Sequence, residues 1–276
     1  LRTVTGVQTC ALPIFSVAST SSRPAVLCGG GSFSQSDTSQ AWTFHRSTST
    51  FREWIRMDAA LFPFVPKDED ISLRTDAAWN LLQSRLQACA DCPLSDGRTN
   101  VVPGEGYRES PVLFIGEAPG ADEDIQGRPF VGRAGQLLTQ ILSSGGIQRK
   151  DAYITNVVKC RPPQNRVPTV QEMMFCNKYL ESQIALINPK IIVCLGNTPL
   201  KWLTKTTEGI TSLRGKWLKW RGIDFFPMFH PSYLLRNDSR KAGSPKHLTW
   251  QDVQELRKRW DEISGSHAAS TEGASK

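Results

Sequence analysis

The chain has 276 residues, and its 33 Lys and Arg outnumber its 26 Asp and Glu, for a formal charge of +7 at pH 7. This length suits one globular domain of about 150 to 200 residues with extra sequence beside it. Seven cysteines are too few for a disulfide-rich secreted scaffold, and no apolar run approaches the roughly 20 residues that cross a bilayer. The composition excludes a membrane-spanning protein and allows a polyanionic partner.

The first 58 residues are expected to lie outside the folded domain. Residues 1–14 contain a string that resembles the translation of a sequencing adapter; a secretory signal is the alternative, but Pro13 interrupts its apolar stretch. Residues 15–58 are rich in Ser, Thr, Gly and Gln, which predicts a disordered leader. The folded domain is expected at 59–263, and a disordered tail at 264–276.

Along the rest of the chain, segments with apolar residues at helical spacing alternate with short apolar segments typical of strands. They predict helices at 75–88, 132–144, 169–187, 197–204 and 249–263, and strands at 112–116, 152–158, 190–196 and 224–230. Several strands are apolar almost throughout, as in parallel sheets that are covered on both faces. The sequence therefore predicts an α/β protein: a three-layer α/β/α sandwich around a central, mainly parallel four-stranded sheet.

Polar residues and glycines follow the predicted strands. Gly116 and Glu117 end the first, Asn156 lies in the second, Asn197 follows the third and His230 ends the fourth. Ligands of such folds bind beyond the carboxyl ends of the strands, so these residues predict a shared pocket. For any one of them alone, ordinary turn chemistry is the alternative.

The cysteines carry a second signal. Cys89 and Cys92 form a C-x2-C pair, while Cys160 and Cys176 lie far downstream. Four thiolates suit a zinc ion or a [4Fe-4S] cluster, and the spacing does not choose between them. On spacing alone, the interpretation that Cys160 and Cys176 are unrelated buried residues is favoured. Cys194, inside an apolar strand, is interpreted as a core residue.

The positive charge is concentrated near the C-terminus. Residues 201–260 contain 13 Lys and Arg against 5 Asp and Glu, an excess larger than that of the whole chain. Aromatic residues are interleaved with these charges on both sides of His230, a composition typical of a groove that binds nucleic acid. A solvated basic face is an equally good alternative.

Four segments, taken with the four cysteines, carry a family resemblance. They are 116–120 (Gly-Glu-Ala-Pro-Gly), 127–132 (Gly-Arg-Pro-Phe-Val-Gly), 155–163 (Thr-Asn-Val-Val-Lys-Cys-Arg-Pro-Pro) and 230–235 (His-Pro-Ser-Tyr-Leu-Leu). Together they resemble the family 4 uracil-DNA glycosylases, the iron-sulfur type, over residues 81–263. The resemblance implies an enzyme that flips uracil out of DNA, hydrolyses its N-glycosidic bond and leaves an abasic site.

The resemblance also overturns the interpretation favoured by the cysteine spacing. It implies that a structural [4Fe-4S] cluster is bound by Cys89, Cys92, Cys160 and Cys176, with zinc as the alternative.

Roles for the pocket residues follow from the same resemblance. Phe130 would stack on the flipped base, and Asn156 would pair with uracil N3-H and O4, a pattern that cytosine cannot match. His230 would donate a hydrogen bond to O2 as negative charge develops there. The turn at Gly116, Glu117 and Ala118 would supply backbone contacts to the base.

The group that activates water is less defined. Alignment on Pro119 with the family 1 enzymes puts Ala118 where that family has its water-positioning Asp, and Gly120 where it has a thymine-excluding Tyr. Glu117 and Glu123 are therefore the catalytic candidates, and Glu123 could instead fill the space of a thymine methyl. No lysine of the matched segments is expected to act as a Schiff-base nucleophile, which predicts a monofunctional enzyme.

Residues after His230 are the candidates for contact with DNA, as a wedge in the gap left by the base and as a phosphate contact: Tyr233, Leu234, Leu235 and Arg236. The expected partner is uracil-containing DNA, single- or double-stranded, with no membrane. A monomer in the cytoplasm of a prokaryote is expected. The alternatives are a non-catalytic iron-sulfur module that binds DNA or a polymerase, and an electron-transfer protein.

Overall fold

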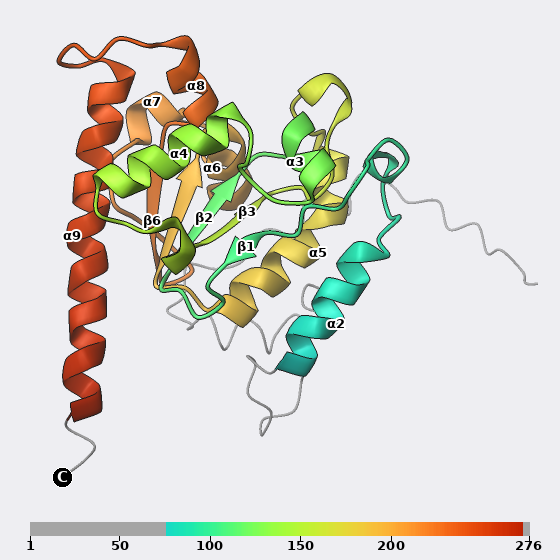
Figure 1. The fold of residues 1–276 in the computed structure, drawn as a ribbon, viewed down its shortest axis with the longest axis horizontal. Helices are drawn as coiled ribbons and strands as arrows, with labels where there is room; N and C mark the ends of the chain where they lie inside the picture. The colour runs from blue at the N-terminus through green and yellow to red at the C-terminus, as the bar shows by residue number, and fades with distance from the viewer. Residues whose placement is uncertain (1–75, 273–276) are drawn as a thin grey trace, which may run out of the picture. The chain divides into compact units, whose positions relative to one another are not determined.

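The computed structural model describes residues 76–272, with side chains as far as residue 264. A six-stranded sheet in the order β1-β3-β2-β4-β6-β5 forms its centre (Figure 1). The strands are β1 (Glu105–Gly106), β2 (Val112–Gly116), β3 (Tyr153–Asn156), β4 (Ile191–Leu195), β5 (Leu218–Trp220) and β6 (Ile223–Met228). The inner four strands are parallel, and β1 and β5 pair antiparallel at the two edges.

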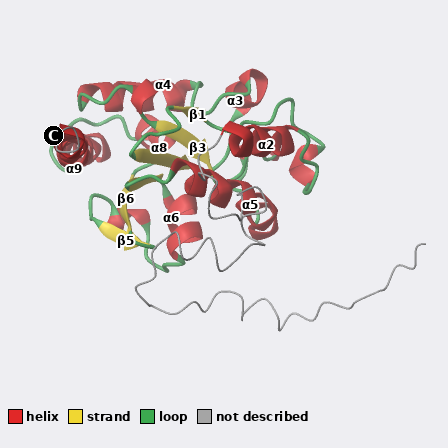
Figure 2. Ribbon diagram, turned by 90° about the horizontal axis from the view of Figure 1, so that it is seen from below, coloured by secondary structure: helices red, strands yellow, loops and turns green. Residues whose placement is uncertain are grey.

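Helices cover both faces of the sheet (Figure 2). They are α2 (Asp76–Gln87), α3 (Ala121–Gln126), α4 (Arg133–Ser144), α5 (Val170–Ile187), α6 (Asn197–Thr204), α7 (Ile210–Leu213), α8 (Pro231–Arg236) and α9 (Pro245–Glu272). Helices α4 and α9 pack on one face, α5 and α6 lie on the other, and α2 packs against α5. None of the helices described is both long and apolar enough to span a membrane.

The alternation of side chains along the strands divides the core into two halves. In β2, Leu113 and Ile115 join the core half beneath α2, α5 and α6, whereas Val112 and Phe114 join the half beneath α4 and α9. All five residues of β2 are buried, because a strand covered on both faces has no exposed side. The predicted three-layer α/β/α class is confirmed.

The two edge strands are the main difference from the predicted four-stranded sheet. Strand β1 has two residues and β5 has three, too short to produce an alternating apolar pattern. Strand β5 is joined to β6 by a tight two-residue hairpin turn. Arg221 and Gly222 in this turn both have positive φ, 48° and 80°, and Trp220 pairs with Ile223 across it. Gly222 is the residue by which the sequence could have indicated this turn.

The C-terminal boundary also differs. Helix α9 continues to Glu272, so residues 264–272 are helical where a disordered tail is predicted. The predictions for residues 1–58 fall outside the described residues, as do 59–75 of the predicted domain and the last four residues of the tail.

Candidate functional site

The carboxyl ends of β2 and β3 bring two predicted residues together. Gly116 and Asn156 are partners in the parallel ladder. A Cβ atom placed on Gly116 would lie 2.4 Å from Asn156 Oδ1 and 2.5 Å from Phe130 Cζ, well inside any normal contact distance. Glycine at this position therefore lets the amide and the aromatic ring approach each other.

The Asn156 amide has an unusual environment. The residue is 1 % exposed. Among the described residues, its Oδ1 is the buried side-chain polar atom that lacks a hydrogen-bond partner. An unsatisfied buried acceptor costs about 1 to 3 kcal/mol, and in a native fold it calls for an explanation such as a ligand.

His230 lies at the start of α8 with its imidazole in a defined state. Its Nδ1 accepts a hydrogen bond from the backbone N-H of Ser232 at 3.1 Å, which makes Nε2 the protonated nitrogen of the neutral ring. Burial, together with the positive charge of Arg236, lowers the pKa of His230 to about 4. At neutral pH the ring is therefore a neutral donor through Nε2.

Phe130 faces His230, with ring centroids 5.8 Å apart. Its backbone has φ of 51°, in the left-handed region that few non-glycine residues adopt. Helix α4 packs closely here, since a Cβ on Gly135 would lie 1.8 Å from the Phe130 carbonyl oxygen. A constrained segment of backbone thus holds the Phe130 ring near the carboxyl ends of β2 and β3.

Glu123, a candidate for catalysis, is engaged in holding that same segment. Its Oε1 accepts hydrogen bonds from the backbone N-H groups of Val131 and Gly132, at 2.9 and 2.8 Å, and its Oε2 accepts from Gly120 at 3.1 Å. Both carboxylate oxygens therefore have backbone donors. The structure gives Glu123 a positioning role next to Phe130, and this geometry disagrees with a role as water activator.

Replacing Glu123 with Ala is expected to lower the free energy of unfolding by about 2 kcal/mol, because three backbone donors lose their acceptor. Gln126→Ala, on the exposed face of the same helix, is the matched control and should change it by less than about 0.5 kcal/mol. Urea denaturation measures both variants. Equal stabilities for Glu123→Ala and the unmutated protein would contradict the anchoring role.

Glu117, the other catalytic candidate, directly follows β2, and its side chain is partly buried. Its Oε2 accepts a hydrogen bond from the Thr198 hydroxyl at the start of α6. Neighbouring Ala118 packs against the core. Asn197, the second amide predicted at the strand ends, instead accepts from the backbone N-H of Ile210 at 2.8 Å, which fixes the start of α7.

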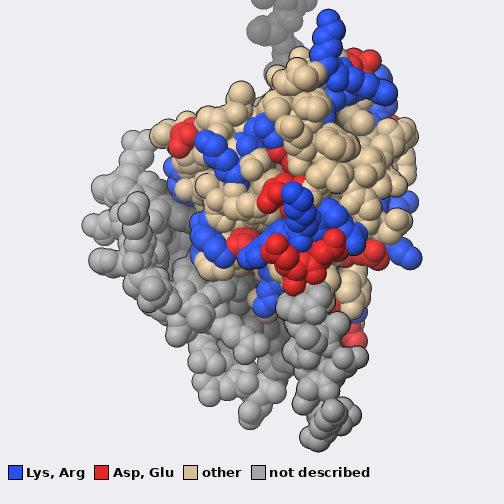
Figure 3. All heavy atoms as spheres, turned by 90° about the vertical axis from the view of Figure 1, so that its left-hand side faces the viewer, with Lys and Arg blue, Asp and Glu red and all other residues tan. Residues whose placement is uncertain are grey.

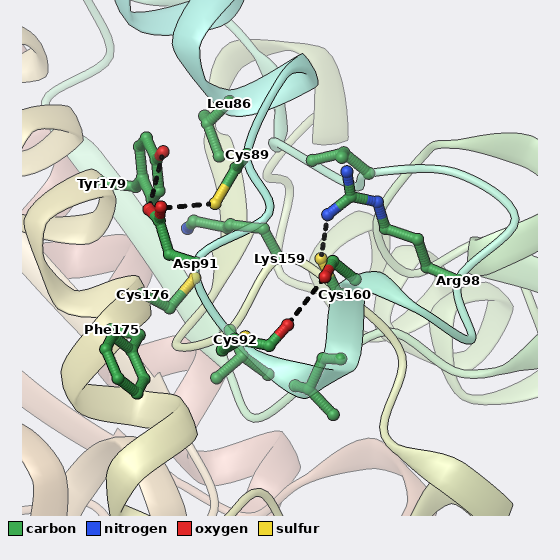
Figure 4. Close-up of a pocket in the computed structure, with 14 residues that line it drawn as sticks. Leu86, Cys89, Asp91, Cys92, Arg98, Lys159, Cys160, Phe175, Cys176 and Tyr179 are labelled. Atoms are coloured by element: carbon green, nitrogen blue, oxygen red, sulfur yellow. Dashed lines mark hydrogen bonds between the residues drawn. The ribbon is translucent and has the colours of Figure 1, made fainter. Parts of the chain in front are cut away.

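The structure brings the four predicted cysteines to one pocket (Figure 4). Cys89 and Cys92 lie in the turn after α2, Cys160 lies in the loop after β3, and Cys176 lies on α5. All four are free thiols, the first two half-buried and the others buried. Cys160 and Cys176 therefore share a pocket with the C-x2-C pair, as the family resemblance implies. Cys194, as predicted, is a fully buried core residue.

The thiols have a polar surrounding. Arg98 Nη1 donates to Cys160 Sγ at 3.3 Å, and the Cys89 thiol donates to Asp91 Oδ2 at the same distance. Burial raises the pKa of Cys160, and it raises that of Cys176 to about 12. Among residues 76–264, no three His, Cys, Asp or Glu side chains lie close enough together to hold one metal ion.

Lys159 links the cysteine pocket to the backbone of Asn156, and the sequence analysis assigned it no role. Its side chain is fully buried, and its Nζ donates to Thr155 Oγ1, the Asn156 carbonyl and Gln183 Oε1 at 2.6, 2.6 and 2.7 Å. Burial lowers the pKa of this amine to about 7. The residue lies in a matched segment directly before Cys160, so one side chain links the loop that carries the thiol to the backbone of Asn156.

Helix α8 carries the four predicted DNA contacts. Tyr233, Leu235 and Arg236 are exposed. Leu234, in contrast, is 1 % exposed and packs into the core, because it lies on the inward face of the helix. The prediction for Leu234 as a surface wedge is therefore wrong.

The basic C-terminal region is less uniform than its composition suggests. On the flank formed by α9, basic and acidic side chains are mixed (Figure 3), and they form ion pairs such as Arg257–Asp261 and Arg259–Asp224. Most of its aromatic residues are in the core. Tyr233 and Trp250 are exceptions, with exposed rings.

Comparison with known proteins agrees with this site. A model of the uracil DNA glycosylase superfamily matches residues 103–254. This range includes Gly116, Phe130, Asn156 and His230 as well as Cys160 and Cys176. The chain belongs to this superfamily.

Three similar proteins narrow the assignment. A type-4 uracil-DNA glycosylase of Thermotoga maritima is 46% identical over 179 residues, covering 64% of this chain and 92% of that protein. The type-4 enzymes of Sulfurisphaera tokodaii and Saccharolobus solfataricus are 47% and 43% identical, covering 56% and 57% of this chain and 75% and 77% of those proteins. Within the superfamily, the chain is thus of the type-4 family.

Proposed function

We propose that this protein is a DNA-repair glycosylase that removes uracil from DNA by hydrolysis of its N-glycosidic bond. The observation that carries the proposal is the unsatisfied Asn156 Oδ1, buried between Gly116 and Phe130 beyond the ends of β2 and β3. A flipped base would supply the missing donor. Extrusion of the base costs a few kcal/mol, which contacts with the rest of the DNA offset.

Asn156 selects the base. Its Oδ1 accepts from uracil N3-H, and its NH2 group donates to O4. Cytosine has an unprotonated N3 and a donor in place of O4, so both contacts would become mismatched in a buried site. Phe130 stacks on the base, and backbone groups at Gly116, Glu117 and Ala118 complete the contacts.

His230 assists departure of the base. As the bond between N1 and the deoxyribose C1′ breaks, negative charge develops on the uracil ring, notably at O2. The neutral imidazole donates to O2 through Nε2, because Nδ1 is occupied by the Ser232 N-H. Water then adds to C1′. Glu117, whose carboxylate is partly exposed and held by Thr198, is our candidate for the group that orients this water.

The reaction ends at the abasic site. A lyase step would need an amine that attacks C1′, and Lys159 is the lysine of the matched segments. Its amine is fully buried and donates to three acceptors, which keeps it away from the sugar. Borohydride, which reduces a Schiff base to a stable amine, should therefore trap no covalent complex between this protein and DNA.

Replacement of Lys159 by Met is expected to lower kcat/KM for uracil release about tenfold, since the Asn156 backbone loses the donor that fixes it. Lys150→Met, at an exposed lysine, is the matched control and should leave kcat/KM unchanged. Steady-state kinetics compare kcat/KM on DNA that contains uracil with kcat/KM on DNA that contains a 5-substituted uracil. A displaced Asn156 changes the ratio of the two values, whereas a loss of folded protein lowers both equally. A tenfold loss with an unchanged ratio would contradict the positioning role.

We further propose that the four cysteines hold a [4Fe-4S] cluster. The support for this proposal is that four free thiols, from the turn after α2, the loop after β3 and helix α5, line one pocket. Four thiolates suit a [4Fe-4S] cluster, with a zinc ion as the alternative. When bound, the cluster would supply a structural crosslink between α5, the turn after α2 and the loop after β3.

The proposed enzyme acts as a monomer on single- or double-stranded DNA, in the cytoplasm of a prokaryote. Tyr233, Leu235 and Arg236 are its proposed wedge and phosphate contacts.

Glu123 remains our candidate for exclusion of the thymine methyl: Glu123→Ala should then gain activity on G:T relative to G:U duplexes. A non-catalytic DNA-binding module is the alternative, and it would not need Asn156, Phe130 and His230 in one pocket.

Incubation with a uracil-containing oligonucleotide, followed by alkali, tests the proposal. Cleavage at the uracil position, with free uracil released and no cleavage of the matched cytosine or thymine strands, is the expected result. Binding without release would favour the non-catalytic module.

An absorption shoulder near roughly 400 nm in the spectrum of the purified protein would identify an iron-sulfur cluster, since zinc is a d10 ion without such absorption.

A further inference from the structure

A cavity separate from the cysteine pocket lies between α4, α8 and the start of α9. Its volume is about 460 Å3, within the roughly 300 to 1,000 Å3 usual for small-ligand sites. Leu137, Ile141 and Leu234 give it an apolar lining, while Arg240 and Lys246 bring positive charge to it. An apolar recess with cations beside it suits a planar ring attached to an anionic group.

Trp250 supplies an aromatic surface at this cavity. The side chain is 53 % exposed, although tryptophan is usually mostly buried in a soluble domain. Its ring stacks on that of His247, with centroids 6.4 Å apart and an angle of 24° between the planes. The pair forms a supported platform, and every nucleobase has a face that can stack on such a platform.

Charge at the cavity favours a polyanion. Arg236, Arg240 and Lys241, in α8 and the connection that follows it, form no ion pair with a described residue, unlike the paired cations along α9. Basic side chains accordingly gather at the end of the molecule where α8 and α9 are joined (Figure 3). Lys246 is paired with Asp238, whereas Arg240 forms no ion pair with a described residue and attracts Asp238 only at longer range.

The cavity is close to the base pocket. Leu234, which lines it, follows His230 by four residues, which is about one helical turn or 6 Å along α8. A DNA strand with its uracil at His230 would therefore pass this cavity with a nearby nucleotide.

We infer that this cavity is a second nucleic-acid subsite, in which a base flanking the uracil stacks on Trp250 while its phosphate contacts Arg240. The inference rests on the proposed function in one respect, the placement of uracil at His230. It predicts that nucleotides on one side of the uracil increase affinity and that those on the other side do not.

The test uses the full chain and a uracil-free single strand about 12 nucleotides long, within the range that single-strand sites cover. By fluorescence anisotropy, Trp250→Ala should weaken binding roughly five- to tenfold, and Trp250→Phe should restore most of it, because base stacking on an aromatic ring survives this exchange. Arg240→Ala should reduce the slope of log Kd against log salt by about 0.7, as expected for one lost phosphate contact. Matched controls are Tyr107→Ala, an exposed aromatic elsewhere, and Lys258→Ala, an exposed cation on α9.

Uracil-containing substrates locate the effect. On a trinucleotide whose central uracil has an abasic site on each side, no flanking base can stack, so Trp250→Ala should keep the unmutated kcat/KM. On strands that carry bases on one side of the uracil only, it should raise KM for one of the two directions. Unweakened binding by Trp250→Ala, equal losses in the two controls, or an equal loss on the trinucleotide without flanking bases would each overturn the inference. Because the binding strand lacks uracil, failure of uracil release would sink the proposed function and leave this measurement intact.

Discussion

Replacing His230 with Ala is expected to lower kcat for uracil release about 100- to 1,000-fold, the usual effect of losing one preorganised donor to a developing anion. KM should change little, because the contact with O2 strengthens only as the bond breaks. His230→Gln keeps an N-H donor in the same region and should recover part of the loss. Single-turnover kinetics measure the chemical step, and a loss confined to KM would contradict this role.

The pH dependence of stability and of kcat provides a second test of the role of His230 as a neutral hydrogen-bond donor. The folded protein keeps the ring neutral down to about pH 4, whereas an imidazole in the unfolded chain titrates near pH 6.5. As the pH falls from about 6.5 towards 4, the unfolded state takes up a proton that the folded state does not, so this residue makes the fold less stable. His230→Gln should remove that part of the acid sensitivity, and kcat should show no inflection near pH 6.5. An inflection there that disappears in the variant would contradict a neutral donor.

Asn156→Leu is expected to abolish uracil release, with kcat/KM reduced about 1,000-fold or more, because the N3-H and O4 groups of the base would be buried without partners. The same change should leave the free energy of unfolding equal or raise it by about 1 kcal/mol. The reason is that an unsatisfied buried acceptor is replaced by an apolar group of similar shape.

This opposite movement of activity and stability is the distinctive result, and it requires both kinetics and urea denaturation. Val193→Ala is the comparison. Val193 lies in β4 with its side chain in the core half beneath α4 and α9, and its truncation should lower the free energy of unfolding because it leaves a cavity. If Asn156→Leu instead destabilised the fold as an ordinary core mutation does, the amide would be structural, and its role in reading uracil would be wrong.

Much of the fold could be predicted because its elements are regular. The parallel strands are apolar on both faces, and Thr169 with Glu172 forms the capping box that begins α5, so element type and order follow from local patterns. The edge strands were missed because two or three residues carry no periodicity. The end of α9 was misplaced because its final turns are polar.

The location of a candidate residue was predictable where it lies at the end of one strand, as with Asn156 at the end of β3 and His230 shortly after β6. The role of a residue was not predictable where a contact joins distant segments. Glu123 was read as a catalytic carboxylate, and only the fold shows its oxygens receiving the backbone donors beside Phe130. Lys159 was given no role, since its three acceptors come together only in the folded chain. Leu234 shares its motif with exposed neighbours, and helix phase alone buries it.

The position of α2 bears on how this enzyme can be shortened. This helix packs on α5, and the turn that follows it carries Cys89 and Cys92, both of which precede the 103–254 region that the superfamily model matches. A fragment trimmed to that region would retain Asn156, Phe130 and His230 yet keep only half of the thiols. Under the proposed cluster, such a fragment would lack two of the four ligands, so we expect a stable fragment of this protein to begin at or before α2.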